Sequence, residues 1–180
     1  MLGNVSYWLA LSLAFIPIHS FAATDTTQTV IRIYGDIIEA ACKVKDKDLV
    51  VDFGTLTNKD LMWNGRSVSH DFAIEFECAT NNTYEAAISF IGQETFYNDL
   101  QRRIMIDGDT PTNPWGIAIQ LTTENGTSIP INAQTVKYSI KNLSALKFKA
   151  FVEASQSAIS RKNIRLGEFN AIAHFVVEYQ

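Results

Sequence analysis

The sequence has few of the residues that bind metals or build redox sites. Its 180 residues include two cysteines and three histidines, and no Cys-x-x-Cys motif occurs. Only His70 and His174 lie beyond the first 22 residues, and they are not spaced as a pair of metal ligands. We therefore expect no metal site and no small-molecule cofactor.

Clustered basic charge is also lacking. Basic residues occur singly or in short pairs, and the formal net charge is −4, whereas a nucleic-acid-binding protein carries a clustered basic face. No carboxylate pair or glycine-rich phosphate loop occurs. His70 and Asp71 stand next to two serines, Ser67 and Ser69, but neighbours along a strand point to opposite faces, so these side chains do not assemble a nucleophilic site unaided. We expect no nucleic-acid partner and no enzymatic activity.

The first 22 residues contain no Asp, Glu, Lys or Arg. Tyr7 to Ile16 form an apolar run of about ten residues, which is too short to cross a bilayer and has the size of a signal-peptide core. Ser20 and Ala22 place small residues where a signal peptidase cleaves. Although Met1 to Ser6 lack the usual basic residue, we expect a signal peptide at 1–22 and an exported mature chain. In an exported chain two cysteines most often pair, so Cys42 and Cys78 are expected to form a disulfide.

Aromatic residues are plentiful and alternate with polar ones. Eleven Phe, six Tyr and three Trp favour strands over helices. Period-two alternation predicts strands at 29–44, 49–53, 71–78, 85–91, 104–106, 115–123, 128–132, 136–140, 146–152 and 167–180. Asn125-Gly126 is a strong hairpin signal. No helical period is evident, so 55–67 and 155–165 are predicted to be irregular. The pattern predicts an all-β antiparallel sandwich.

Three segments together resemble the subunits of type 1 fimbriae that the periplasmic chaperone–usher pathway assembles. The first is the alternating segment Thr29–Ile38 with one glycine, followed by Ala41-Cys42-Lys43-Val44. The second is Phe72–Cys78, in which a cysteine ends a strand. The third and most specific is the C-terminus, where a glycine fourteen residues from the end is followed by Ala-x-Ala-x-Phe and a penultimate tyrosine.

The resemblance implies an incomplete immunoglobulin-like sandwich that lacks its last strand. It implies a signal peptide at 1–22, an N-terminal donor-strand extension at 23–38 and a pilin domain at 39–180. The donor residues, which would fill successive pockets of a neighbouring subunit, are Thr29, Ile31, Ile33, Gly35 and Ile37. The C-terminal strand would line a groove and face the chaperone through Gly167, Phe169, Ala171, Ala173, Phe175, Val177, Tyr179 and Gln180.

The implied function is that of a structural subunit of an adhesive fimbria (pilus) on the bacterial cell surface. It would polymerise by donor-strand exchange after a periplasmic chaperone delivers it to an outer-membrane usher, so its partners are the chaperone, the usher and neighbouring subunits. Nine glycines and many aromatics favour a minor or adaptor subunit over an abundant shaft subunit.

Two competing interpretations remain at this point. The segment from Thr29 to Ile37 can also be an ordinary first strand of the chain's own sandwich, with Gly35 at a β-bulge. The whole chain can also be a secreted lectin-like carbohydrate-binding module that stacks sugar on Trp63 and Trp115 in its loops. A two-domain tip adhesin would be nearly twice as long, which counts against this alternative.

Overall fold

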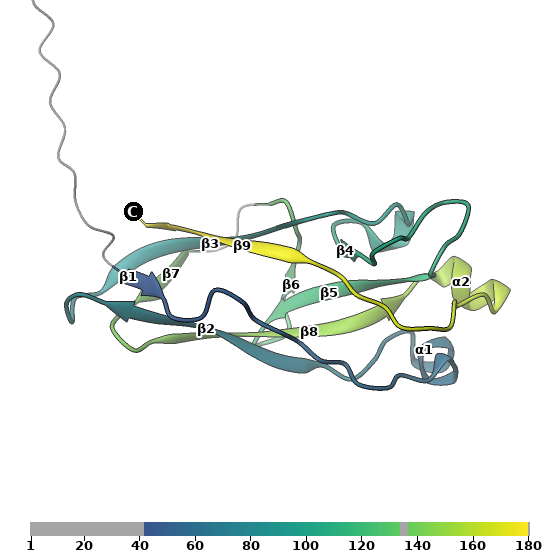
Figure 1. Ribbon diagram of the computed structural model, residues 1–180, viewed down its shortest axis with the longest axis horizontal. Helices are drawn as coiled ribbons and strands as arrows, with labels where there is room; N and C mark the ends of the chain where they lie inside the picture. The colour runs from purple at the N-terminus through teal and green to yellow at the C-terminus, as the bar shows by residue number, and fades with distance from the viewer. Residues whose placement is uncertain (1–41, 134–136, 180) are drawn as a thin grey trace, which may run out of the picture. The chain divides into compact units, whose positions relative to one another are not determined.

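Nine strands in the described residues, 42–133 and 137–179, form two antiparallel sheets in the computed structural model (Figure 1). The larger sheet has the order β1-β2-β8-β5-β4, and β6 also pairs with β5; its strands are β1 (Cys42–Val44), β2 (His70–Cys78), β8 (Ala145–Ala154), β5 (Ile117–Thr123), β4 (Ile104–Met105) and β6 (Ser128–Ile129). The smaller sheet has the order β7-β3-β9, with β7 (Lys137–Ile140), β3 (Tyr84–Gly92) and β9 (Ala173–Tyr179). The predicted antiparallel, mostly β fold is confirmed.

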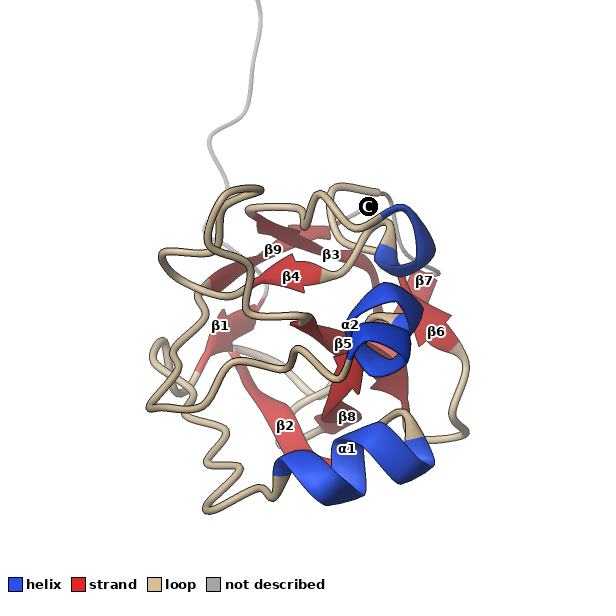
Figure 2. Cartoon of the chain, turned by 90° about the vertical axis from the view of Figure 1, so that its right-hand side faces the viewer, coloured by secondary structure: helices blue, strands red, loops and turns tan. Residues whose placement is uncertain are grey.

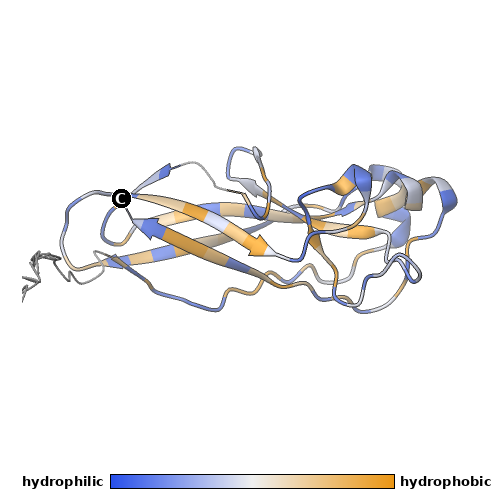
Figure 3. Cartoon of the chain, turned by 90° about the horizontal axis from the view of Figure 1, so that it is seen from above, coloured by the Kyte–Doolittle hydropathy of each residue, from blue (hydrophilic) through white to orange (hydrophobic). Residues whose placement is uncertain are grey.

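The core lies between the two sheets because alternate side chains of each strand point inward. Ile74 and Phe76 of β2 and Ile88 of β3 are fully buried. The ring of Phe148 on β8 lies 5.4 Å from that of Phe90 on β3, centroid to centroid, so aromatic contacts join the sheets. Apolar residues run along β3 and β9, which lie side by side (Figure 3).

The predicted disulfide is present and joins the first two strands. Cys42 on β1 lies directly opposite Cys78 on β2, and their sulfur atoms are bonded. The bond closes a loop of 36 residues, which would stabilise the fold by about 4 kcal/mol on the chain-entropy model.

Two short helices occur where irregular chain was predicted. Helix α1 (Asn58–Asn64) begins after Thr57, whose Oγ1 accepts a hydrogen bond from the Asp60 amide at 3.1 Å. Helix α2 (Gln156–Arg161) begins after Ser155, whose Oγ accepts a hydrogen bond from the Ser157 amide at 3.3 Å. Both helices lie at one end of the sandwich (Figure 2). No helix in the described ranges is long and apolar enough to cross a membrane.

Most of the predicted strands within the described residues are confirmed. Two of the strand predictions were wrong. Residues 49–53 form no strand, although they alternate as predicted. The last strand begins at Ala173 instead of Gly167, because its partner β3 ends at Gly92, opposite Ala173. Residues 167–172 therefore extend beyond the ladder. The predicted signal peptide and donor extension lie outside the described residues.

Candidate functional site: an open groove beside the last strand

Strand β9 has a described strand partner along only one of its two edges. It pairs with β3 in antiparallel register from Ala173 to Tyr179, and no other strand of the described chain pairs with it. The irregular segment 45–57 runs opposite its other edge (Figure 1). A groove with a volume of about 320 Å³ lies between the two.

Asn170 is the one residue with a polar side chain among those that line the groove. Its floor comes from both sheets, and its two walls come from the chain after β1 and the chain leading into β9. The lining residues are Leu49, Val50, Val51, Phe53, Phe72, Phe90, Ile104, Ile119, Leu121, Ala150, Phe169, Asn170, Ala171, Ala173 and Phe175. The rings of Phe53 and Phe169 approach to 6.2 Å, centroid to centroid, across the groove.

Burial differs sharply between β9 and its partner. On β3 the inward residues Ala86, Ile88 and Phe90 are at most 4 % exposed. On β9 the corresponding residues, which include Phe175 and Val177, are only half-buried although they pack against the core. The sandwich therefore leaves part of its core uncovered along β9. An apolar face next to a strand edge with free backbone groups can bind an additional extended strand.

The predicted groove residues divide into two sets. Phe169, Ala171, Ala173 and Phe175 line the groove, whereas Val177 and Tyr179 do not and instead pack half-buried against the core. Gly167 is exposed near the Trp115 ring. Gln180 lies outside the described residues, as do the predicted donor residues Thr29, Ile31, Ile33, Gly35 and Ile37. His174 of β9 is exposed.

The opposite wall was not predicted as part of the site. Leu49, Val51 and Phe53 are half-buried and face the groove from segment 45–57. Their alternation is visible in the sequence, but alternation by itself predicts an ordinary strand. It places side chains on one face; a ladder additionally needs a partner backbone, and no described segment supplies one.

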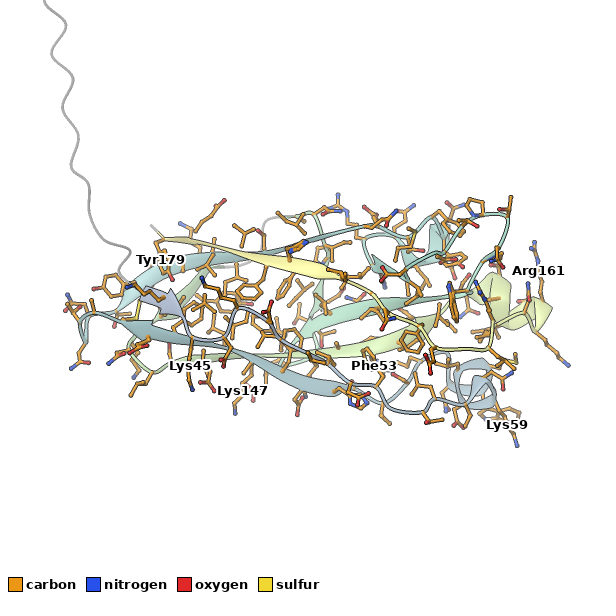
Figure 4. All side chains as sticks on the ribbon, in the orientation of Figure 1. Lys45, Phe53, Lys59, Lys147, Arg161 and Tyr179 are labelled. Atoms are coloured by element: carbon orange, nitrogen blue, oxygen red, sulfur yellow. A yellow bond between two sulfur atoms is a disulfide. The ribbon has the colours of Figure 1, made fainter. Side chains whose placement is uncertain are left out.

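A hydrogen bond joins the end of β9 to β1. The Tyr179 hydroxyl donates a hydrogen bond to the Cys42 carbonyl oxygen at 3.0 Å, so a side chain of the last strand reaches the backbone of the first (Figure 4). Burial raises the pKa of the Tyr179 hydroxyl above its ordinary value.

Trp115, one of the two tryptophans considered for sugar stacking, is covered. Trp115 is only 5 % exposed, and the Arg165 guanidinium covers its ring at 4.3 Å from the centroid. The neighbouring carboxylate of Asp109 is buried and accepts hydrogen bonds from the Trp115 amide at 2.8 Å and the Tyr97 hydroxyl at 3.1 Å. Burial raises the pKa of Asp109, although these bonds and Arg165 oppose the shift. Trp63 remains exposed on α1.

The fold and groove together define an antiparallel β-sandwich whose core is left open along its last strand. A family model described as fimbrial protein matches residues 31–180, and the chain belongs to this family.

Two curated relatives come from Proteus mirabilis (strain HI4320). The chain is 27 % identical over 165 residues to the putative minor fimbrial subunit PmfF, and the match covers 89 % of this chain and 90 % of the relative. It is also 27 % identical over 183 residues to the major MR/P fimbria protein, and that match covers 99 % of each.

Solved structures share the fold. The P pilus rod subunit PapA superimposes with a TM-score of 0.64 at 23 % identity, covering 78 % of this chain and 100 % of PapA. A chain from a structure of a chaperone-usher pilus gives a TM-score of 0.62 at 21 % identity, covering 86 % of this chain and 96 % of that one. The predicted pilin-like sandwich is thereby confirmed.

Proposed function

We propose that this chain is a structural subunit of an adhesive fimbria that accepts a strand from one neighbour in its groove and donates its own N-terminal strand to another. The observation that supports this most strongly is the uncovered apolar groove along β9, which a single extended strand would fill. Membership of the fimbrial protein family agrees with this role.

The donor segment is 23–38, with Thr29, Ile31, Ile33, Gly35 and Ile37 as the residues that enter the neighbour's groove. An isolated strand of nine residues is about 30 Å long and has two unpaired edges and one apolar face, so it is stable only within another sheet. Each fully buried isoleucine would contribute roughly 1.5–3 kcal/mol, and the backbone ladder adds to this. Glycine at position 35 fits a place where the groove floor leaves no room for a side chain.

Delivery follows from the exported character of the chain. The signal peptide at 1–22 directs it to the periplasm, where a chaperone covers the groove and binds the carboxylate of Gln180 through basic side chains. The outer-membrane usher then replaces the chaperone by the donor segment of the next subunit. The mature chain is incorporated into a fimbria on the cell surface.

Composition supports a minor or adaptor rank within the fimbria. The chain has nine glycines and a high aromatic content. The two curated relatives, one a putative minor subunit and the other a major fimbria protein, are equally similar to it at 27 % identity. The rank therefore rests on composition alone.

Periplasmic expression tests the role. We expect the chain to be degraded or to aggregate when it is expressed without a cognate chaperone, and to be soluble in complex with one. A stable soluble monomer in the absence of any chaperone would contradict the proposal. Deletion of Ala23 to Gly35 should preserve chaperone binding but prevent the subunit from filling its neighbour's groove, so donor and acceptor roles are separated.

A further inference from the structure

The hydrogen bond between Tyr179 and Cys42 occupies a backbone position at which an added strand would pair. The Lys45 amide donates to the Glu75 carbonyl at 2.9 Å, and opposing pairs in an antiparallel ladder alternate between hydrogen-bonded and non-hydrogen-bonded. Cys42, opposite Cys78, therefore belongs to a non-hydrogen-bonded pair. Its carbonyl points away from β2, to the free edge of β1, where it accepts the hydrogen bond from the Tyr179 hydroxyl.

The groove does not extend along the whole of β9, which ends at Tyr179. Its lining on this side extends from Phe169 to Phe175 and does not include Val177 or Tyr179. Six residue steps along an extended chain cover about 20 Å. A strand of that length presents about four side chains to the groove, whereas the chain's own donor segment has five inward positions, from Thr29 to Ile37.

We propose that Tyr179 is a specificity-determining residue of the acceptor groove, whose hydroxyl closes the groove beyond Phe175 and limits how many residues of an incoming strand are bound. This inference rests on the proposed strand-accepting function. In an antiparallel arrangement, the amino end of the incoming strand lies near the end of β9. The position equivalent to Thr29 is therefore the one that Tyr179 excludes.

Competition between two peptides of different length tests this inference. One peptide has the sequence of residues 29–37 and the other that of residues 31–37, which lacks the position opposite Tyr179. The acceptor is the chain from Ala23 to Gln180 carrying Ile31→Asp and Ile33→Asp, so that its own segment does not compete, and it is supplied in complex with a periplasmic chaperone that the peptides replace. Both peptides are equilibrated with it at a denaturant concentration where binding is reversible, and the bound ratio is measured by mass spectrometry.

In the acceptor with Tyr179 we expect the two peptides to bind within about a factor of two of each other. Tyr179→Phe removes only the hydroxyl and should favour the longer peptide by about two- to tenfold, the effect of one neutral hydrogen bond. Tyr84→Phe is the matched control, because it removes a hydroxyl bonded to Thr80 at 2.6 Å, away from the groove lining. The control should leave the ratio unchanged.

Three outcomes would overturn one of the two proposals, and they are distinguishable. If both peptides bind but Tyr179→Phe leaves their ratio as it is in the parent chain, the inference about Tyr179 is wrong and strand acceptance stands. The inference is equally wrong if the longer peptide already binds more than tenfold better to the parent chain. If neither peptide binds to any variant, the proposed strand-accepting function itself is contradicted.

Discussion

Ala173→Asp should block strand acceptance while leaving the subunit itself folded. The Ala173 side chain lines the groove at the first residue of β9, opposite Gly92 on β3. It is half-buried when the groove is empty, so a carboxylate there still reaches water. Once a strand fills the groove, the same carboxylate is enclosed among apolar side chains without a cation to pair with.

The magnitude follows from the cost of desolvating an unpaired charge, which amounts to several kcal/mol in real proteins. Even about 3 kcal/mol corresponds to a loss of roughly a hundredfold in affinity. His174→Asp is the matched control, because this neighbouring residue is exposed on the opposite face of β9. It introduces the same side chain one residue away and should change binding by less than about threefold.

The assay is fluorescence anisotropy with a labelled peptide of residues 29–37, which replaces a periplasmic chaperone on the chain whose own donor segment carries Ile31→Asp and Ile33→Asp. Equal yields of the soluble chaperone complex before titration check that each variant is folded. Equal peptide affinity for the Ala173→Asp and His174→Asp variants, both folded, would refute the assignment of this groove as the strand-binding site.

Three further predictions concern stability and are measured by denaturant unfolding of the chain with a peptide of residues 29–37 bound in its groove. Gly116→Ala should lower the free energy of unfolding by about 2–4 kcal/mol, because residue 116 has a φ of +77° and its new Cβ would lie 2.6 Å from the Ala158 side chain. Gly126→Ala, at a φ of +84° in open space, should lower it by only about 1 kcal/mol. Equal losses would contradict the packing argument. Replacing both Cys42 and Cys78 by serine should cost about 4 kcal/mol, and an unchanged unfolding midpoint would show that the disulfide is dispensable. Burial raises the folded-state pKa of Asp109, so the contribution of this group to stability is present below its ordinary pKa and is lost as pH rises through the folded-state value. Asp109→Asn should remove this decline in stability with pH. Parallel pH profiles of stability for the two proteins would contradict the prediction.

The central strands could be predicted because their burial on one face imposes a period of two. Phe72 to Cys78 and Leu146 to Val152 show this alternation, and both segments form strands of the core. The hairpin at Asn125-Gly126 was also predicted, because this residue pair suits a turn with positive φ angles. Gly126 has such a positive φ in the structure.

The helices could not be found by periodicity because each is less than two full turns long. Their signals were local: Thr57 and Ser155 are capping residues, and Gly65 ends α1 with a left-handed backbone conformation. The acceptor groove was predicted on one side only. The role of segment 45–57 as its other wall depends on a missing ladder partner, which no alternation in the sequence reveals.

The most direct test of strand acceptance is a structure of the mature chain within its assembly and of the same chain as an isolated monomer. We predict that in the assembly the free edge of β9 pairs with an N-terminal segment from another subunit, lying over Phe169 to Phe175. A monomer in which residues 29–37 of the same molecule pair stably with that edge of β9 would contradict it.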